Sequence, residues 1–183
     1  MKILAICPSK YPDKLKKMMD SYVVTKSNYT GIQICYDMDK TVPQMFNNAF
    51  EKEPNYDFYM LLNDDIIFNT PLWDIALANK CKISYADDGL QGKNLCAFPM
   101  IDGNIARALG WLVMPYFKKY CGDVVWKFMG ESLKILEYHP EVSITHNWDE
   151  TQVDKDIHKS DMMEFAKWLP WAYKDLAKIR RIL

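Results

Sequence analysis

The sequence predicts an α/β protein with a mostly parallel central sheet flanked by helices. Short apolar segments alternate with amphipathic segments through the first half of the chain, and polar residues directly follow several of the apolar ones. Strands that alternate with helices favour parallel pairing through right-handed crossovers. The 183 residues are 49% hydrophobic and 14% aromatic, which is enough to bury the core of one domain.

In the first half, apolar stretches predict strands at residues 2–6, 32–36, 58–62, 82–85 and 95–100. Helices are predicted at residues 12–24, 42–51 and 70–79. The first helix has an apolar face that includes Leu15, Met18 and Tyr22. Pro43 suits the first turn of the second helix, and Thr70 can cap the third.

The second half is less regular. It predicts helices at residues 103–109 and 123–136, a short strand at 142–145 that ends at His146, and a polar, acidic loop at 147–156. A helical pattern resumes near Ser160. Pro170 should break that helix, because proline removes a backbone donor and clashes with the preceding turn.

Polar side chains follow three of the predicted strands. They are Pro8, Ser9 and Lys10 after the first strand, Asp37 after the second, and Asn63, Asp64 and Asp65 after the third. In a parallel sheet, ligands bind beyond the carboxyl ends of the strands, so these groups are expected at one rim. The chain has neither the dinucleotide-binding glycine fingerprint nor the P-loop motif.

The adjacent carboxylates in DFYMLLNDDIIF are the strongest local signal. Burying Asp64 and Asp65 beside a core strand is costly without a cation or several hydrogen-bond donors. Mg²⁺ and Mn²⁺ prefer oxygen ligands, often one or two carboxylates together with water and phosphates. The pair therefore predicts a divalent-metal site. The alternative is an acidic turn that caps the helix starting near Thr70.

The composition of the chain and the spacing of its cysteines and histidines argue against several other classes of protein. A net charge of −1 provides no global argument for nucleic-acid binding, and no apolar run approaches the roughly 20 residues that span a bilayer. The five cysteines form no C-x-x-C pair, and the three histidines do not have zinc-motif spacing. Reduced thiols in a cytoplasmic protein are expected.

Taken in order, several segments resemble the GT-A glycosyltransferases, the family-two-like enzymes that use nucleotide-diphosphate sugars. They are ICPSKYPDKL, LLNDDIIF, ISYADDG, LGWLVMPYFKKYCGDVVW and YHPEVSITH. Over residues 1–150 their order and spacing are similar to those of small phage-encoded glycosyltransferases, for which the location would be the host cytoplasm. The resemblance implies a single Rossmann-like GT-A domain over residues 1–183. Within it, it implies a nucleotide-sugar half at 1–100, an acceptor and catalytic half at 101–150, and a small C-terminal helical segment at 151–183.

The resemblance also implies roles for individual residues. Asn63, Asp64 and Asp65 match the D-x-D motif of the family, but Asn63 stands where many members have aspartate. This departure makes Asp65 the expected direct metal ligand, with Asp64 near the ribose or a metal-bound water. His146 falls where many members have a further metal ligand, and its alternative is a surface residue. The rest of the donor pocket would be lined by Pro8, Ser9, Lys10 and Asp37.

The acceptor side has its own candidates. Asp123, in GDVVW, falls where the family places its catalytic base, and its alternative is a helix N-cap. Asp87 and Asp88 lie in a loop that would stand beside the sugar or acceptor. Trp126 could stack on a sugar, although a core aromatic under the helix is an equal alternative.

These assignments predict a metal-dependent glycosyltransferase, inverting in mechanism, that uses Mn²⁺ or Mg²⁺ and a UDP-sugar. The acceptor would be a hydroxyl, such as that of a hydroxymethylated pyrimidine in phage DNA, and no membrane partner is expected. Three alternatives remain: transfer to a protein or glycan, a nucleotidyltransferase on a similar sheet, and a non-catalytic nucleotide-binding module of the same fold. The nucleotidyltransferase is less favoured because Cys7-Pro8-Ser9-Lys10 contains no glycine.

Overall fold

The computed structural model describes residues 1–37, 39–78, 82–147 and 153–183, whose strands form one seven-stranded sheet. The strands are β1 Ile3–Pro8, β2 Thr30–Cys35, β3 Phe58–Leu61, β4 Ile66–Phe68, β5 Ile83–Asp87, β6 Met100–Asp102 and β7 Leu136–His146. The helices are α1 Pro12–Thr25, α2 Val42–Lys52, α3 Trp73–Leu77, α4 Gly103–Leu109, α5 Gly122–Leu133, α6 Lys155–Trp168 and α7 Ala172–Arg180. Two short 3₁₀ turns are η1 Gly92–Asn94 and η3 Leu169–Trp171.

The strand order is β2-β1-β3-β6-β5-β7-β4. β1 is parallel to β2 and β3, and β5 is parallel to β7. β6 is antiparallel to both β3 and β5, and β4 is antiparallel to β7. Consequently β1, β2, β3, β5 and β7 run in one direction, and their carboxyl ends lie at one edge. This arrangement confirms the predicted α/β class with a mostly parallel sheet.

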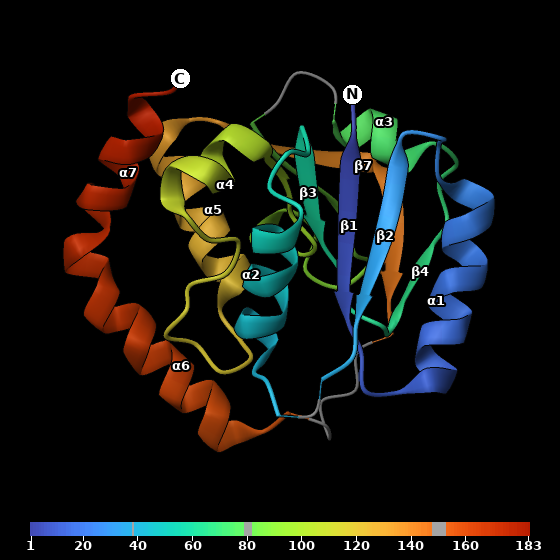
Figure 1. The fold of residues 1–183 in the computed structure, drawn as a ribbon, viewed down its shortest axis with the longest axis horizontal. Helices are drawn as coiled ribbons and strands as arrows, with labels where there is room; N and C mark the ends of the chain where they lie inside the picture. The colour runs from blue at the N-terminus through green and yellow to red at the C-terminus, as the bar shows by residue number, and fades with distance from the viewer. Residues whose placement is uncertain (38, 79–81, 148–152) are drawn as a thin grey trace.

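Helices cover both faces of the sheet (Figure 1). Alternate residues of β1 point to opposite faces, so Ile3 and Ile6 belong to two different core clusters. The Ile3 cluster contains Trp73 with buried apolar side chains of α1 and α3. The Ile6 cluster contains Phe46 and Trp126 with further buried apolar side chains from α2, α4, α5 and α7. Among the described helices, none has both the length and the apolar character that crossing a membrane requires.

The chain around β6 differs from the prediction of a strand at residues 95–100. Here β6 begins only at Met100, because Phe98 has a positive φ of 51° and Pro99 follows it. A left-handed backbone is unusual for a bulky residue, and it interrupts strand pairing. The turn places the Phe98 ring against the His146 ring, with centroids 4.9 Å apart.

The last strand is much longer than the predicted 142–145 segment. β7 has 11 residues. Its first half pairs with β5, and its end pairs with β4. The sequence pattern did not predict β4. The β5–β7 register shifts beyond Ala86, opposite the segment that contains Pro140. Proline has no N–H and is tolerated at such an irregularity. Because of this course, β7 ends with His146 opposite Ile66 of β4.

The observed helix boundaries agree with the predicted ones at some positions and differ at others. α4 has the predicted bounds, and the helical break at Pro170 is confirmed by the turn η3 between α6 and α7. The predicted cap of α3 is wrong: the helix begins at Trp73, and Thr70 Oγ1 instead accepts a hydrogen bond from Ser143 N (2.9 Å). Thr70 therefore joins the α3 loop to β7 and does not start the helix.

A buried carboxylate, Asp74, joins α3 to the start of β2. It has no exposed surface and accepts hydrogen bonds from Ser27 N, Ser27 Oγ, Thr30 Oγ1 and Ile75 N. Replacing Asp74 with alanine should lower the free energy of unfolding by about 3 kcal/mol, because several buried donors lose their acceptor. Thermal denaturation should show a Tm about 10 °C lower. Asp20→Ala, at an exposed position on α1, is the matched control, and an equal Tm for both variants would contradict the assignment.

Candidate active site

The carboxyl ends of the five co-directional strands gather polar residues at one edge of the sheet. β1 is followed by Ser9 and β3 by Asp64 and Asp65, as the sequence predicted for these strands. Two further strands contribute to the same edge: Asp88 directly follows β5, and His146 ends β7. Figure 1 shows the arrowheads of β1 and β2 at this edge. The predicted rim therefore exists and is wider than three strands.

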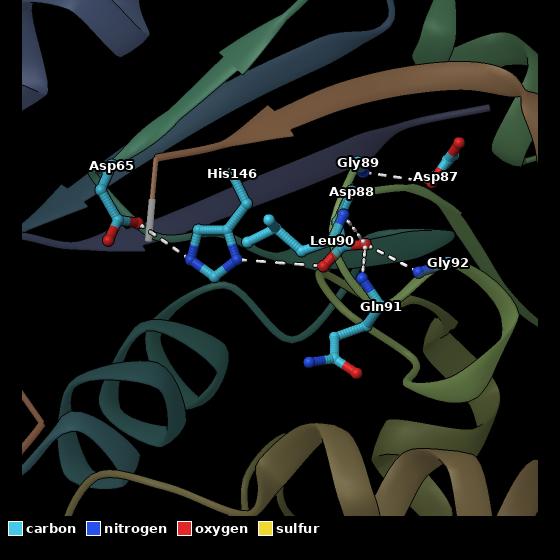
Figure 2. Close-up of polar contacts among 8 residues, drawn as sticks. All are labelled: Asp65, Asp87, Asp88, Gly89, Leu90, Gln91, Gly92 and His146. Carbon is cyan, nitrogen blue, oxygen red and sulfur yellow. Dashed lines mark hydrogen bonds and ion pairs between the residues drawn. The ribbon is translucent and has the colours of Figure 1, made fainter. Parts of the chain in front are cut away.

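Asp65 and His146 meet at this rim. Asp65 Oδ1 lies 3.5 Å from His146 Nε2, and Figure 2 shows the two side chains pointing toward each other. Their backbones hold this arrangement, since Ile66 pairs with His146 and Asn147 N donates to the Asp65 carbonyl oxygen (2.8 Å). The described residues provide no hydrogen-bond donor for the buried Asp65 Oδ1. A nearby cation would stabilise a carboxylate oxygen in this state.

The two side chains fit a divalent cation. Mg²⁺ ligands stand at about 2.0–2.1 Å from the ion, so neighbouring ligands are roughly 3 Å apart, close to the observed separation. Within the described ranges, no group of three or more His, Cys, Asp or Glu side chains forms a candidate metal site. The protein would therefore supply Asp65 and His146, and water or substrate phosphates would complete the shell, as is usual for Mg²⁺.

Asp64 contacts Ser9, the residue that follows β1. Its Oδ2 accepts a hydrogen bond of 2.6 Å from Ser9 Oγ, and Ser9 is buried. The sequence predicted both residues for the donor side, and the structure brings them together. A cavity of about 380 Å³ lies beside them. Its lining residues are Lys14, Lys17, Asp64, Asp65, Ile66, Ile67 and Asn147.

Asp123 lies in the first turn of α5, one residue after the helix begins. The residue that caps the helix is Cys121, so the alternative role of Asp123 as the N-cap is wrong. Its Oδ1 accepts a hydrogen bond from Val124 N (2.8 Å). Burial raises the pKa of the Asp123 carboxyl above its usual value, while that hydrogen bond and the nearby charges of His146 and His158 lower it in part. The influence of His146 places Asp123 in the electrostatic environment of the Asp65–His146 pair.

The remaining donor-side candidates lie on the rim without a described hydrogen bond or ion pair to Asp64 or Asp65. Pro8 ends β1, and Lys10 and Asn63 are exposed. Asp37 forms an ion pair with Lys40 (2.9 Å), and this contact is the main cause of its lowered pKa. The charge of Lys10 lowers the same pKa further.

The acceptor-side candidates divide into three cases. Asp87 is half-buried, and its Oδ1 accepts a hydrogen bond from Gly89 N (3.1 Å). Asp88 is only 2% exposed and faces His146. Trp126 is fully buried, with Nε1 donating to the Leu112 carbonyl oxygen (2.8 Å), so it offers no face on which a sugar could stack. The alternative of a core aromatic describes Trp126 correctly. Trp148, considered for stacking as well, lies outside the described residues.

One residue that positions the site was not apparent from the sequence. Asp161 of α6 is fully buried and accepts hydrogen bonds from the backbone N–H groups of Lys118 (2.9 Å), Lys119 (2.9 Å) and Tyr120 (2.8 Å). These residues form the loop that leads into α5 and Asp123. Nothing in the local pattern around Asp161 distinguishes it from the other acidic residues of a solvated helix. Asp161 therefore holds the approach to Asp123 from a distant part of the chain.

The cysteines near the rim are not nucleophiles. Cys7 of β1 is fully buried, and burial raises the pKa of its thiol, as do the nearby charges of Asp64 and Asp65. Burial likewise raises the pKa of Cys96 and, to about 12, that of Cys121. Thiols with raised pKa values are unreactive at neutral pH. These raised pKa values therefore argue against a cysteine nucleophile at this rim.

Comparison with solved structures identifies the fold. No protein-family model and no curated protein matches the sequence. The catalytic domain of Drosophila β1,4-galactosyltransferase 7, in complex with xylobiose, has a TM-score of 0.61 over 84% of this chain and 73% of that chain, at 8% identity. A mutant of the same enzyme, bound to manganese, UDP-Gal and xylobiose, has the same TM-score over 85% of this chain and 75% of that chain, also at 8% identity.

Two further structures match with comparable scores. A197 from STIV has a TM-score of 0.57 at 17% identity, over 82% of this chain and 87% of that chain. S. aureus TarS has a TM-score of 0.59 at 10% identity, over 79% of this chain and 37% of TarS. Such low identities establish the fold alone, and the fold is that of the GT-A glycosyltransferases.

Proposed function

We propose that this protein is a metal-dependent glycosyltransferase that moves a sugar from a nucleotide-diphosphate sugar to an acceptor hydroxyl. The observation that carries the proposal is the convergence of Asp65 and His146, 3.5 Å apart, at the carboxyl edge of a GT-A sheet. A buried carboxylate oxygen without a donor beside an imidazole suits a divalent cation. Manganese and UDP-Gal bound to a fold neighbour support the same choice of cofactor and donor.

The chain's own residues provide the donor side of the reaction. Asp65 and His146 would hold Mn²⁺ or Mg²⁺, which, when bound, stabilises the negative charge on the leaving diphosphate. Asp64, fixed by Ser9, would orient the ribose or a water near the ion. Lys14 and Lys17 line the cavity next to these carboxylates, where cationic side chains can face the phosphate groups of the donor.

Asp123 is the proposed general base. An acceptor hydroxyl must lose its proton as it attacks the anomeric carbon, and a nearby carboxylate can accept that proton. Burial raises the pKa of Asp123, which makes the ionised carboxylate a better proton acceptor than an exposed aspartate. Direct attack by the acceptor, assisted by a base, inverts the anomeric configuration, so an inverting outcome is the one we propose.

A donor screen tests the proposal. Nucleotide sugars, UDP-sugars first, should raise the Tm of the protein when Mn²⁺ is present and much less when it is chelated, because Asp65 and His146 would hold the ion that favours binding of the diphosphate. Slow release of the nucleoside diphosphate should accompany binding. If no nucleotide sugar stabilises the protein and none is hydrolysed, the function is wrong. Release of pyrophosphate would indicate a nucleotidyltransferase, and binding without turnover would indicate a non-catalytic module.

The acceptor is tested separately. A hydroxymethylated pyrimidine in duplex DNA and a protein or glycan hydroxyl both remain predictions, and the xylobiose bound to a fold neighbour supports a glycan. Incubation with donor and hydroxymethylated DNA, digestion to nucleosides and mass spectrometry should detect a glycosylated base if DNA is the acceptor. A parallel reaction with β-linked disaccharides, analysed by NMR at the new anomeric centre, identifies a glycan acceptor and its stereochemistry.

A further inference from the structure

Asp88 uses its two carboxylate oxygens in different ways. Oδ1 accepts three hydrogen bonds from the turn that follows β5, donated by Leu90 N (3.1 Å), Gln91 N (2.7 Å) and Gly92 N (2.9 Å). Oδ2 is buried, and no described residue donates a hydrogen bond to it. An oxygen that accepts three N–H groups is fixed in place. The carboxylate is therefore rigid, and its second oxygen is directed elsewhere.

The second oxygen of Asp88 is directed at His146. Asp88 Oδ2 lies 4.0 Å from His146 Nδ1, an ion-pair separation, and the Asp88 carbonyl oxygen accepts a hydrogen bond from His146 N (3.1 Å). On the other side of the ring, His146 Nε2 faces Asp65 Oδ1. The Phe98 ring packs edge-on against the imidazole. Figure 2 shows the three side chains in the order Asp88, His146, Asp65.

We propose that Asp88 is a positioning residue that prepares His146 to bind the cation. A carboxylate next to Nδ1 favours the tautomer that carries its proton on that nitrogen, which directs the Nε2 lone pair at Asp65 and the ion. Asp88 thus acts through His146 and does not touch the sugar or the acceptor, which its burial also opposes. The inference rests on the proposed metal site and assigns a residue that supports it.

The variant Asp88→Asn separates this role from a structural one. The amide oxygen can take the place of Oδ1 and keep the three backbone hydrogen bonds, so the turn keeps its shape. The amide NH₂ then replaces Oδ2 and presents a donor to Nδ1. A donor facing Nδ1 from 4.0 Å favours an unprotonated Nδ1 and so a proton on Nε2, the atom that should bind the ion.

Two measurements follow. In metal-free protein, at a pH where the imidazole is neutral, ¹⁵N chemical shifts of His146 should show the proton on Nδ1 in the wild type and on Nε2 in Asp88→Asn. Titration with Mn²⁺ alone, followed by electron paramagnetic resonance, should show an affinity about 10–100-fold lower in the variant. Asp20→Asn, at an exposed position on α1, is the control for loss of one carboxylate, and its tautomer and Mn²⁺ affinity should be those of the wild type.

Several outcomes would overturn the inference. The same His146 tautomer in the wild type and Asp88→Asn, or equal Mn²⁺ affinities, would show that Asp88 does not determine the tautomer of His146 or prepare it to bind the ion. If Asp88→Asn does not fold, the ¹⁵N chemical shifts of the wild type decide the question. A wild-type His146 that carries its proton on Nε2 would contradict the proposal. If the wild type binds no Mn²⁺, the proposed function fails, whereas the tautomer measurement still decides whether Asp88 positions His146.

Discussion

Replacing Asp123 with asparagine should lower kcat for sugar transfer by about 10²–10⁴-fold, the usual contribution of a general base. Asparagine has nearly the same shape and can still accept the hydrogen bond from Val124 N, but its amide cannot accept the acceptor's proton. The wild-type enzyme should also lose kcat/KM as the pH falls through the raised pKa of Asp123. The reason is that only the ionised carboxylate is a base.

The same variant should be at least as stable as the wild type at neutral pH. The pKa of Asp123 is higher in the folded protein than in the unfolded chain. Between those two pKa values the folded state binds more protons, so the stability contributed by this group is full below the unfolded pKa and is lost as the pH rises through the folded pKa. At pH 7 the buried charge is therefore unfavourable, and an amide removes it.

Transfer rates and thermal denaturation of metal-free protein, both at neutral pH, test the two expectations together. Glu131→Gln, at an exposed position later on α5, provides a control for removal of a carboxylate from the same helix. A rate within threefold of the wild type in Asp123→Asn would refute the assignment of the base. A large fall in Tm together with lost activity would instead indicate that Asp123 serves the structure of the helix start.

Replacing Asp65 with alanine should weaken Mn²⁺ binding by at least about 100-fold, since the loss of a partner outside the first shell already costs 10–100-fold. Asp65 Oδ1 faces His146 Nε2 at 3.5 Å, and one imidazole alone holds a divalent ion poorly. Binding of a nucleotide sugar should then no longer depend on Mn²⁺, and transfer should fall below detection.

Calorimetry of Mn²⁺ binding, with and without a UDP-sugar, measures both effects of Asp65→Ala. Asp13→Ala, an exposed position in the first turn of α1, removes a carboxylate of the same charge and serves as the control. Unchanged Mn²⁺-dependent binding of the UDP-sugar in Asp65→Ala would move the metal site away from this rim. The proposed function would then need another group to neutralise the leaving diphosphate.

Local patterns were sufficient to predict the sheet and part of the site. Alternating strands and helices predict parallel strands, and parallel strands place Ser9, Asp64 and Asp65 at one edge by geometry alone. The course of β7 was not predictable in this way, because Pro140 resembles a strand break and is accommodated by a register shift. The left-handed backbone of Phe98 depends on tertiary packing in the same manner.

Residues that act over long distances in the chain leave no local signal. Asp74 accepts hydrogen bonds from residues 44 to 47 positions away, and Asp161 from residues 41 to 43 positions away. The turn after Asp88 is suggested by the following Gly89, but the direction of Asp88 Oδ2 toward His146 requires the pairing of β4, β5 and β7. Local patterns therefore suggest the proposed metal ligands, Asp65 and His146, but do not distinguish Asp88, the residue that we propose orients one of them.

The contact between Asp161 and the loop before α5 affects the order in which the chain can fold during synthesis on the ribosome. Residues 118–120 leave the exit tunnel well before Asp161, yet three of their backbone N–H groups receive their acceptor only from that residue. Domains assemble from the N-terminus as synthesis proceeds. The sheet, with Asp65 after β3 and His146 at the end of β7, is complete before Asp161 is translated, whereas the loop before Asp123 is secured only afterwards. If the proposed site is correct, a nascent chain should bind metal before it can catalyse transfer.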